Sequence, residues 1–157
     1  MKRSTVAHLN CSIARTLEIV GEWWTLLVVR DVALGFHRFD DIQRDLGISR
    51  NILSDRLATL VEHDILDRRQ YQDSPPRFEY HLTAKGRDLW PVLSALSRWG
   101  DRWESPEGPP VRFVHKPCGH DTEGLSVCPG CGQEVALHEV RLRKGPGWKP
   151  PAATNVT

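Results

Sequence analysis

The feature that most constrains the fold is a pair of amphipathic helical segments joined by a glycine turn. Asp40 can cap a short helix that ends at Leu46, and Gly47 then turns the chain. Ser49 can cap a second helix that runs to about His63. Two helices joined by so short a turn are typical of a helix-turn-helix motif. Apolar residues at helical spacing predict the buried stripe of the second helix: Ile52, Leu53, Leu57, Leu60 and Val61.

The elements around this motif predict a wing. Helical segments are expected before it, over residues 12–20 and 23–34. After it, two strand-like runs flank the turn "DSPP" and predict a β-hairpin over about residues 66–82. Thr83 can cap a final long helix that runs to about Trp103. We therefore expect a mainly α fold with a β-hairpin wing, which is a winged helix-turn-helix domain.

The outward face of the second helix carries side chains that can read DNA. Arg and Asn hydrogen-bond bidentately to guanine and adenine edges, and Arg50 and Asn51 lie in the N-terminal turn that reaches bases in such motifs. Arginines on both sides of the hairpin tip can contact the DNA backbone or minor groove. The net charge is only +1, so binding would depend on this local cationic face, and an ordinary solvated face is the alternative. The candidate DNA-binding residues are Arg38, Ser49, Arg50, Asn51, Ser54, Asp55, Arg56, Arg68, Arg69 and Arg77.

The stretches "HKPCGH" and "CPGCG" predict a metal site. Cys128 and Cys131 are spaced as in a zinc knuckle, and His115 and Cys118 repeat the two-residue gap with a trailing glycine. The predicted ligands are these four residues, with His120 as an alternative to His115. Three Cys and one His complete a tetrahedron with no open position for water, so we expect one structural zinc ion (Zn2+) per chain. Short strands over residues 111–114, 125–127 and 134–142 would complete a small zinc-ribbon-like β module.

The last helix before this module carries an apolar seam. Leu89, Leu93, Leu96, Gly100 and Trp103 repeat at alternating spacings of about four and three, which is more than one small domain needs to cover itself. We therefore expect a homodimer with Leu89, Leu93, Leu96, Trp99 and Trp103 in its interface. The expected order along the chain is a DNA-binding and dimerisation domain (8–104), a linker (105–111), the zinc-ribbon-like module (112–143) and a disordered tail (144–157).

Several motifs follow one another between Cys11 and Trp103: "GEWWTLLVVRD", "GIS" followed by "LSDRL", "PPRFEYHLTAKG" and "WGDRW". Together with Gly35-x-x-Arg38-Phe39, they resemble the HxlR-type branch of the MarR-like winged-helix transcription regulators. The resemblance implies a homodimer on a near-palindromic operator in double-stranded DNA, and we expect a repressor, with activation as the open alternative. The recognition helix (about 49–63) would enter the major groove and the wing (about 66–82) would contact the backbone or minor groove. The first and last helices would form the dimer interface, and many such regulators carry a similar cysteine-rich extension.

The resemblance also bears on Cys11. Some HxlR-type regulators use an N-terminal cysteine to sense oxidants or electrophiles, and a helix N-terminus favours the reactive thiolate. Ser12 stands where family members usually carry proline, so any tuning of the thiol by that proline is absent. A buried, inert cysteine is the alternative. An oxidant or another small molecule is accordingly the candidate inducer.

Other features bear on location and function class. The sequence has no secretory signal pattern and no apolar run long enough to span a membrane, so we expect a cytoplasmic protein without a membrane partner. It has no nucleophile–base pair, phosphate-binding glycine loop or open metal site, so we do not expect an enzyme. The alternative to a DNA-binding regulator is a protein-interaction adaptor of the transcription machinery, in which winged helix and ribbon dock on protein partners.

Overall fold

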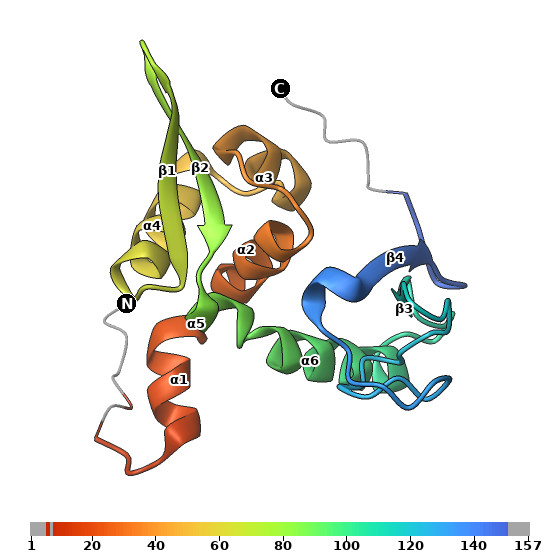
Figure 1. Ribbon diagram of the computed structural model, residues 1–157. Coiled ribbons are helices and arrows are strands. Elements are labelled where there is room, and N and C mark those ends of the chain that lie inside the picture. The colour runs from red at the N-terminus through yellow and green to blue at the C-terminus, as the bar shows by residue number, and fades with distance from the viewer. Residues whose placement is uncertain (1–5, 7, 151–157) are drawn as a thin grey trace. The chain divides into compact units, whose positions relative to one another are not determined.

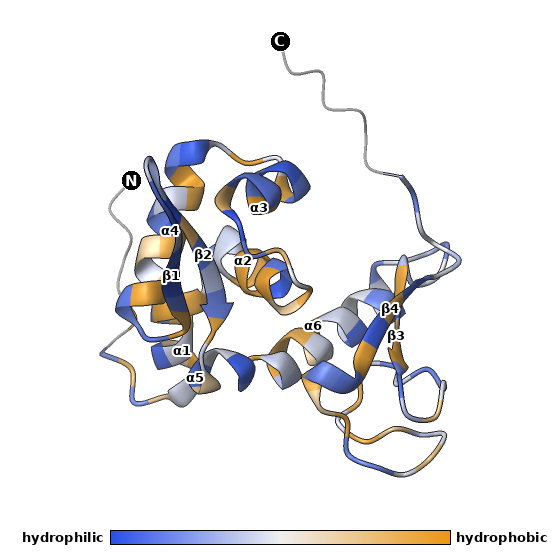
Figure 2. Cartoon of the chain, turned by 45° about the horizontal axis from the view of Figure 1, so that its top comes forward, coloured by the Kyte–Doolittle hydropathy of each residue, from blue (hydrophilic) through white to orange (hydrophobic). Residues whose placement is uncertain are grey.

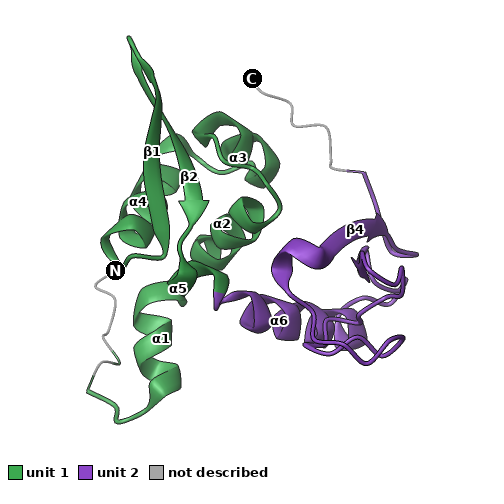
Figure 3. Ribbon diagram, viewed as in Figure 1, with its two compact units in different colours: residues 1–87 green, residues 88–157 purple. Residues whose placement is uncertain are grey.

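The structure, a computed structural model, describes residues 6 and 8–150 of the 157-residue chain (Figure 1). The chain divides into two compact units, residues 1–87 and residues 88–157 (Figure 3). The division falls after Arg87, inside the segment that the sequence assigned to the DNA-binding domain. The sequence-based domain boundaries stay a prediction, and each unit is described by itself below.

Four helices begin the first unit: α1 (Ser12–Val20), α2 (Trp23–Ala33), α3 (Phe39–Leu46) and α4 (Arg50–Glu62). They confirm the helices expected from the sequence. Gly47 adopts the left-handed conformation (φ +64°) that closes α3, and the Ser49 side chain accepts a hydrogen bond from the Ile52 backbone N–H. The N-cap predicted for α3, Asp40, was wrong. Arg38 occupies the N-cap of α3, and Asp40 lies in the first turn, where its carboxylate interacts favourably with the positive end of the helix dipole.

The wing is an antiparallel hairpin of β1 (Leu66–Asp73) and β2 (Pro76–Leu82) that projects beyond the helices (Figure 1). Pairing extends from Leu66 opposite Leu82 out to Asp73 opposite Pro76, with an irregularity between Gln70 and Gln72. The strands therefore continue almost to the tip, and Pro76 stands at the first position of its strand, where a missing N–H is tolerated. In Figure 2 the outer part of this hairpin is hydrophilic.

The core of the first unit lies around α2, which packs against α3, α4 and β2 and is largely hydrophobic in Figure 2. The buried stripe predicted for α4 was partly wrong, because Ile52 is 39% exposed. Leu53, Leu57 and Leu60 already fill the side of α4 that faces the core, and Ile52 is turned by one helical position from that side. The fully buried aliphatic side chains of the first unit are Val28, Val29, Ile42, Leu53, Leu57, Leu60 and Leu66.

The long final helix expected from Thr83 is in fact two helices, α5 (Ala84–Arg87) and α6 (Trp90–Trp103). Thr83 does cap α5, since its hydroxyl accepts a hydrogen bond from the Gly86 N–H. Pro91 explains the break, because it has no N–H for a bond to the Arg87 carbonyl and its ring would collide with that carbonyl in a continuous helix.

The second unit adds β3 (Val111–His115), the 3-10 turn η1 (Leu137–Glu139) and β4 (Val140–Lys144) to α6. Strands β3 and β4 pair antiparallel, so the strand expected over residues 134–142 was placed too early. Residues 125–127 contribute one bridge, from Val127 to Glu134. None of the described helices is long and apolar enough to cross a membrane.

The first part of the expected disordered tail is folded. Lys144 belongs to β4, and the N–H groups of Gly145 and Gly147 donate to the carbonyls of Pro110 and Pro109. Residues 144–148 thus make backbone hydrogen bonds, and the boundary of the tail at residue 144 stays a prediction. Residues 151–157 lie outside the described part of the chain.

Candidate functional site

The N-terminal end of α4 presents exposed polar side chains, as the sequence predicted. Ser49, Arg50 and Asn51 follow the turn from α3, and Ser54 and Asp55 lie one turn further along the same helix. All five are exposed. They sit at the end of α4 where the first backbone N–H groups have no intrahelical acceptor, which is favourable for a phosphate.

Arg50 is held by three side chains of α3 that the sequence reasoning did not select. Its Nη1 donates to Asp40 Oδ1 at 2.9 Å and to Gln43 Oε1 at 3.1 Å. Its guanidinium carbon lies 4.6 Å from the centre of the Phe39 ring, within cation–π range. The three-residue spacing of Asp40 and Gln43 in "FDDIQ" puts both on one helix face and is a signal that could have pointed to them.

Arg56 differs from the other candidates on α4. Its side chain is only 22% exposed, and its Nη1 lies 3.5 Å from Glu22 Oε2. The same Glu22 oxygen accepts a hydrogen bond from the Trp24 N–H and so caps α2. Arg56 Nε is buried without a hydrogen-bond partner in the described part of the chain. Arg56 thus links α4 to the start of α2 and does not join the exposed group at the helix tip.

The wing carries the predicted arginines on exposed positions. Arg68 lies over the Phe78 ring at 3.5 Å, and Arg69 forms an ion pair with Asp67 at 3.3 Å. Arg77 is opposite Gln72, close to the tip. These arginines follow the length of the hairpin and can meet phosphates along it.

Arg38 joins the turn before α3 to the wing. Its Nε donates to Glu79 Oε1 at 3.1 Å, and its guanidinium lies 4.5 Å from the centre of the Tyr71 ring. The hydrogen bond from Arg38 is the main reason that the pKa of Glu79 is lowered. Arg38 therefore orients the hairpin on α3 while keeping an exposed side chain.

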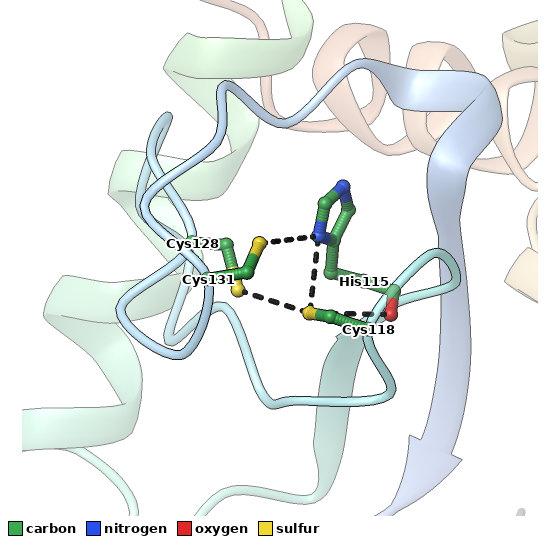
Figure 4. A group of neighbouring side chains, drawn as sticks. All are labelled: His115, Cys118, Cys128 and Cys131. Carbon is green, nitrogen blue, oxygen red and sulfur yellow. Dashed lines mark hydrogen bonds between the residues drawn. The ribbon is translucent and has the colours of Figure 1, made fainter.

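The second unit brings together His115, Cys118, Cys128 and Cys131, whose ligand atoms all lie within 4.8 Å of one another (Figure 4). His115 Nδ1 is 3.3 Å from Cys118 Sγ and 3.5 Å from Cys131 Sγ, and the Sγ atoms of Cys118 and Cys128 are 3.5 Å apart. Ligands at about 2.3 Å around one zinc ion are separated by about 3.8 Å, so the donor set and its spacing fit a tetrahedral metal ion.

Both halves of this cluster are built by the same turn. Gly119 donates to the His115 carbonyl and Gly132 to the Cys128 carbonyl, at 2.7 and 2.8 Å. Their φ angles are +74° and +73°, a conformation that glycine adopts without strain. The repeated pattern that the sequence displays is therefore repeated in three dimensions. His120 is outside the cluster, because its ring packs against Gly130.

The environment of the cluster favours one thiolate. Burial opposes ionisation of Cys128, but the backbone N–H groups of Cys131 and Gly130, together with hydrogen bonds from the Cys118 and Cys131 side chains, lower the Cys128 pKa to about 7. His115 is fully buried, and its Nε2 has no hydrogen-bond partner in the described chain, although Glu139 Oε2 lies 3.6 Å away. A carboxylate behind the second ring nitrogen is a common support for a metal-binding histidine.

The predicted interface residues on α6 and at its N-cap differ in how exposed their side chains are. Leu96, Trp99 and Trp103 are exposed with Val92, whereas Leu89 and Leu93 are half-buried. On α1, Ile13 and Leu17 are exposed apolar residues as well. Cys11 occupies the N-cap of α1 with an exposed side chain that makes no capping hydrogen bond, so the structure does not support the alternative of a buried, inert thiol.

A glycine-turned helix pair with a projecting hairpin defines the winged helix-turn-helix class of DNA-binding transcriptional regulators. The chain belongs to the HxlR-like helix-turn-helix family, whose family model matches residues 19–108. It is 43% identical over 145 residues to an uncharacterized HTH-type transcriptional regulator of Mycobacterium bovis, covering 92% of each chain. Its family and relatives are transcriptional regulators, not enzymes.

Solved structures agree with this assignment. The chain resembles PA1607, a proposed transcription factor, with a TM-score of 0.68 and 36% identity over 88% of this chain and 97% of that one. It also resembles the redox regulator HypR in its oxidized form, with a TM-score of 0.51 and 31% identity over 59% of this chain and 96% of that one. The expected fold class and the regulator function are thereby confirmed.

Proposed function

We propose that this regulator acts as a homodimeric repressor that reads DNA with the tip of α4 and grips the backbone with the β1–β2 wing. The observation that carries the proposal is the exposed group Arg50, Asn51 and Ser54 at the start of α4, on the same compact unit as the wing arginines. Arg and Asn supply base-edge contacts, and the wing arginines supply phosphate contacts that carry no sequence information.

The homodimer is supported by two unpaired apolar stripes. Val92, Leu96, Trp99 and Trp103 on α6 recur at spacings of four, three and four, the pattern by which helices pack in pairs. Ile13 and Leu17 offer a second stripe on α1. A two-fold dimer would carry two recognition helices, suited to half-sites separated by about 34 Å. The repressor role rests on the family resemblance alone.

A structural zinc ion held by His115, Cys118, Cys128 and Cys131 is the cofactor we propose. Three thiolates and one imidazole are a set that zinc binds tightly, and a site filled by four protein ligands has no position for a catalytic water. Bound there, the ion would join the end of β3 and the turn after it to the loop at residues 128–131, and would stabilise a module with few buried apolar residues.

The inducing signal is proposed at the level of chemical class. An oxidant acting on Cys11 is consistent with the exposure of that thiol at a helix N-cap and with the likeness to a structure described as a redox regulator. A protein-interaction adaptor remains the second function class. It is less favoured, because docking on protein does not require base-reading side chains at the α4 tip.

Binding to duplex DNA tests the proposal. Duplexes selected by the full chain from a randomised library should bind with an affinity that falls steeply as salt rises, as phosphate contacts require. Arg50→Ala should lower discrimination between a selected and a scrambled duplex by roughly tenfold or more. Arg69→Ala is the matched control and should weaken both duplexes equally while reducing the salt slope by about one. Unchanged selectivity in Arg50→Ala would remove Arg50 from the reading surface.

A further inference from the structure

We propose that Asp40 is a specificity-determining residue, which holds the Arg50 guanidinium so that only one of its edges is free to read guanine. The inference rests on the proposed function, because it concerns how the tip of α4 reads DNA. Asp40 is not on the recognition helix but on α3, and it touches the base-reading arginine directly. It therefore acts through Arg50 as a positioning residue.

The three α3 contacts leave Arg50 with a defined orientation. Phe39 lies under the guanidinium plane, and Asp40 and Gln43 both accept from the same nitrogen, Nη1. No hydrogen bond engages Nε or Nη2 in the described part of the chain. One edge of the guanidinium is thus fixed to the protein, while the opposite edge, Nε with Nη2, keeps two parallel N–H donors.

Two parallel donors are what a guanine edge in the major groove accepts. O6 and N7 of guanine are adjacent acceptors, and an arginine bonded to both is the commonest specific contact to this base. An arginine already held in position loses less side-chain freedom when it binds than a mobile one does. The α3 contacts therefore favour the contact with guanine in particular.

The negative charge of Asp40 should affect how strongly the chain prefers a selected duplex over other DNA. A carboxylate at the DNA surface repels phosphates on every duplex, whatever its sequence. The repulsion is offset only where the oriented Arg50 finds guanine, because a base without paired acceptors leaves the free edge unbonded. Removing Asp40 should then improve binding to scrambled DNA while weakening the preference for the selected duplex.

Asp41 provides a matched control. It is the next residue on α3, carries the same charge and pairs with Arg44 Nη1 at 3.1 Å instead of with Arg50. Both pairs are at the surface, with side-chain exposures of 64% for Asp40 and 40% for Asp41. Alanine at either position removes one exposed carboxylate, so both variants should fold, which thermal denaturation checks.

The experiment measures dissociation constants of the full chain for a duplex selected by the wild-type chain and for a scrambled duplex. Asp40→Ala should reduce the selectivity ratio by about tenfold, towards the lower end of what one guanine contact contributes. Asp41→Ala should leave the ratio unchanged within about twofold. In the Arg50→Ala background, Asp40→Ala should not change the ratio further, because the arginine through which it acts is gone.

A base substitution gives a readout that a purely structural role would not move. Each guanine of the selected duplex is replaced in turn by 7-deazaguanine, which lacks the N7 acceptor. The wild-type chain should lose about tenfold in affinity at the guanine that Arg50 reads, and Asp40→Ala should lose about twofold or less there. The absence of any such sensitive guanine would overturn the proposal.

The outcomes separate the inference from the function on which it rests. If the wild-type chain selects no duplex, the proposed reading surface fails and the role of Asp40 falls with it. If Arg50→Ala loses selectivity but Asp40→Ala keeps it, only the role of Asp40 is refuted. Equal losses in Asp40→Ala and Asp41→Ala would also overturn it, since they would reflect charge near DNA and not the orientation of Arg50.

Discussion

Asp31 of α2 is a carboxylate enclosed in the core of the first unit, with Oδ2 lacking a hydrogen-bond partner among the described residues. Arg30 Nη2 bridges Asp31 Oδ1 at 2.6 Å and Asp45 Oδ2 of α3 at 2.8 Å. Burial raises the Asp31 pKa to about 6, although Arg30 pulls it down and Asp45 pushes it up. The neutral form of this side chain therefore suits the folded state.

This raised pKa predicts a pH-dependent stability. In the unfolded chain Asp31 ionises near 3.8, so between about pH 4 and pH 6 the folded state binds the extra proton. Its contribution to stability is present below pH 4 and is lost as pH rises through 6, by on the order of 3 kcal/mol. Urea unfolding should show the free-energy difference between Asp31→Asn and wild type growing in favour of the variant over this range. Parallel stability curves would contradict it.

At the scale of elements, α6 offers the sharpest test of the proposed dimer. Trp99 is 59% exposed in the stripe with Leu96 and Trp103. Burying a charge in a paired apolar seam is costly, so Trp99→Glu should weaken dimerisation by at least about tenfold. Arg98→Glu, on the α6 face that contacts Gly124, is the control and should leave the dimer intact. Sedimentation across a concentration series distinguishes the two, and a Trp99→Glu dimer of undiminished strength would exclude this seam.

The elements also show where sequence reasoning succeeds and where it stops. Helices α1 to α4 were predictable because local signals such as Gly47 and Ser49 fix their ends. The helix break at Pro91 was also predictable, because proline is a local helix breaker. It was missed because the apolar repeat continues across Pro91 and suggested one uninterrupted helix. The Arg56–Glu22 ion pair had no local signal, because it joins residues that are far apart in the chain. From the sequence pattern alone, an arginine on a recognition helix is expected to face outward.

The cluster of His115, Cys118, Cys128 and Cys131 shows the same contrast. The paired two-residue gaps identified all four cluster residues, because each knuckle is a local turn. The position of β4 was missed, since the register of Val140–Lys144 against β3 depends on pairing across the whole module. Local spacing thus identified the four residues that come together, and long-range pairing decided the architecture of the unit.

At the scale of the whole molecule, the proposed zinc ion predicts that the two units respond differently to metal removal. Metal analysis of the purified chain should find about one zinc per chain. Chelation or Cys128→Ser should unfold residues 111–148 while the helices of the first unit stay folded, because the metal supplies stability that the few buried apolar residues of the module do not. Amide hydrogen exchange can follow each unit separately.

Cys11→Ser is the matched control for that experiment. It removes a cysteine outside the cluster and should leave both the zinc content and the protection of residues 111–148 unchanged. A wild-type chain that contains no zinc when purified without chelators, or a Cys128→Ser variant that keeps its full zinc content, would rule out the proposed site.

Gly145 and Gly147 pack closely against the segment 108–110. A methyl group on Gly145 would lie 1.9 Å from the Pro109 carbonyl oxygen, and one on Gly147 would lie 2.0 Å from the Gly108 carbonyl oxygen. Lys144 Nζ then rests 3.7 Å from the centre of the Trp148 ring. Anyone trimming the gene for crystallisation should therefore cut beyond Trp148. A stop codon directly after β4 would remove residues 145–148 and with them the contacts to residues 108–110. A fusion partner added after Trp148 would leave these contacts in place.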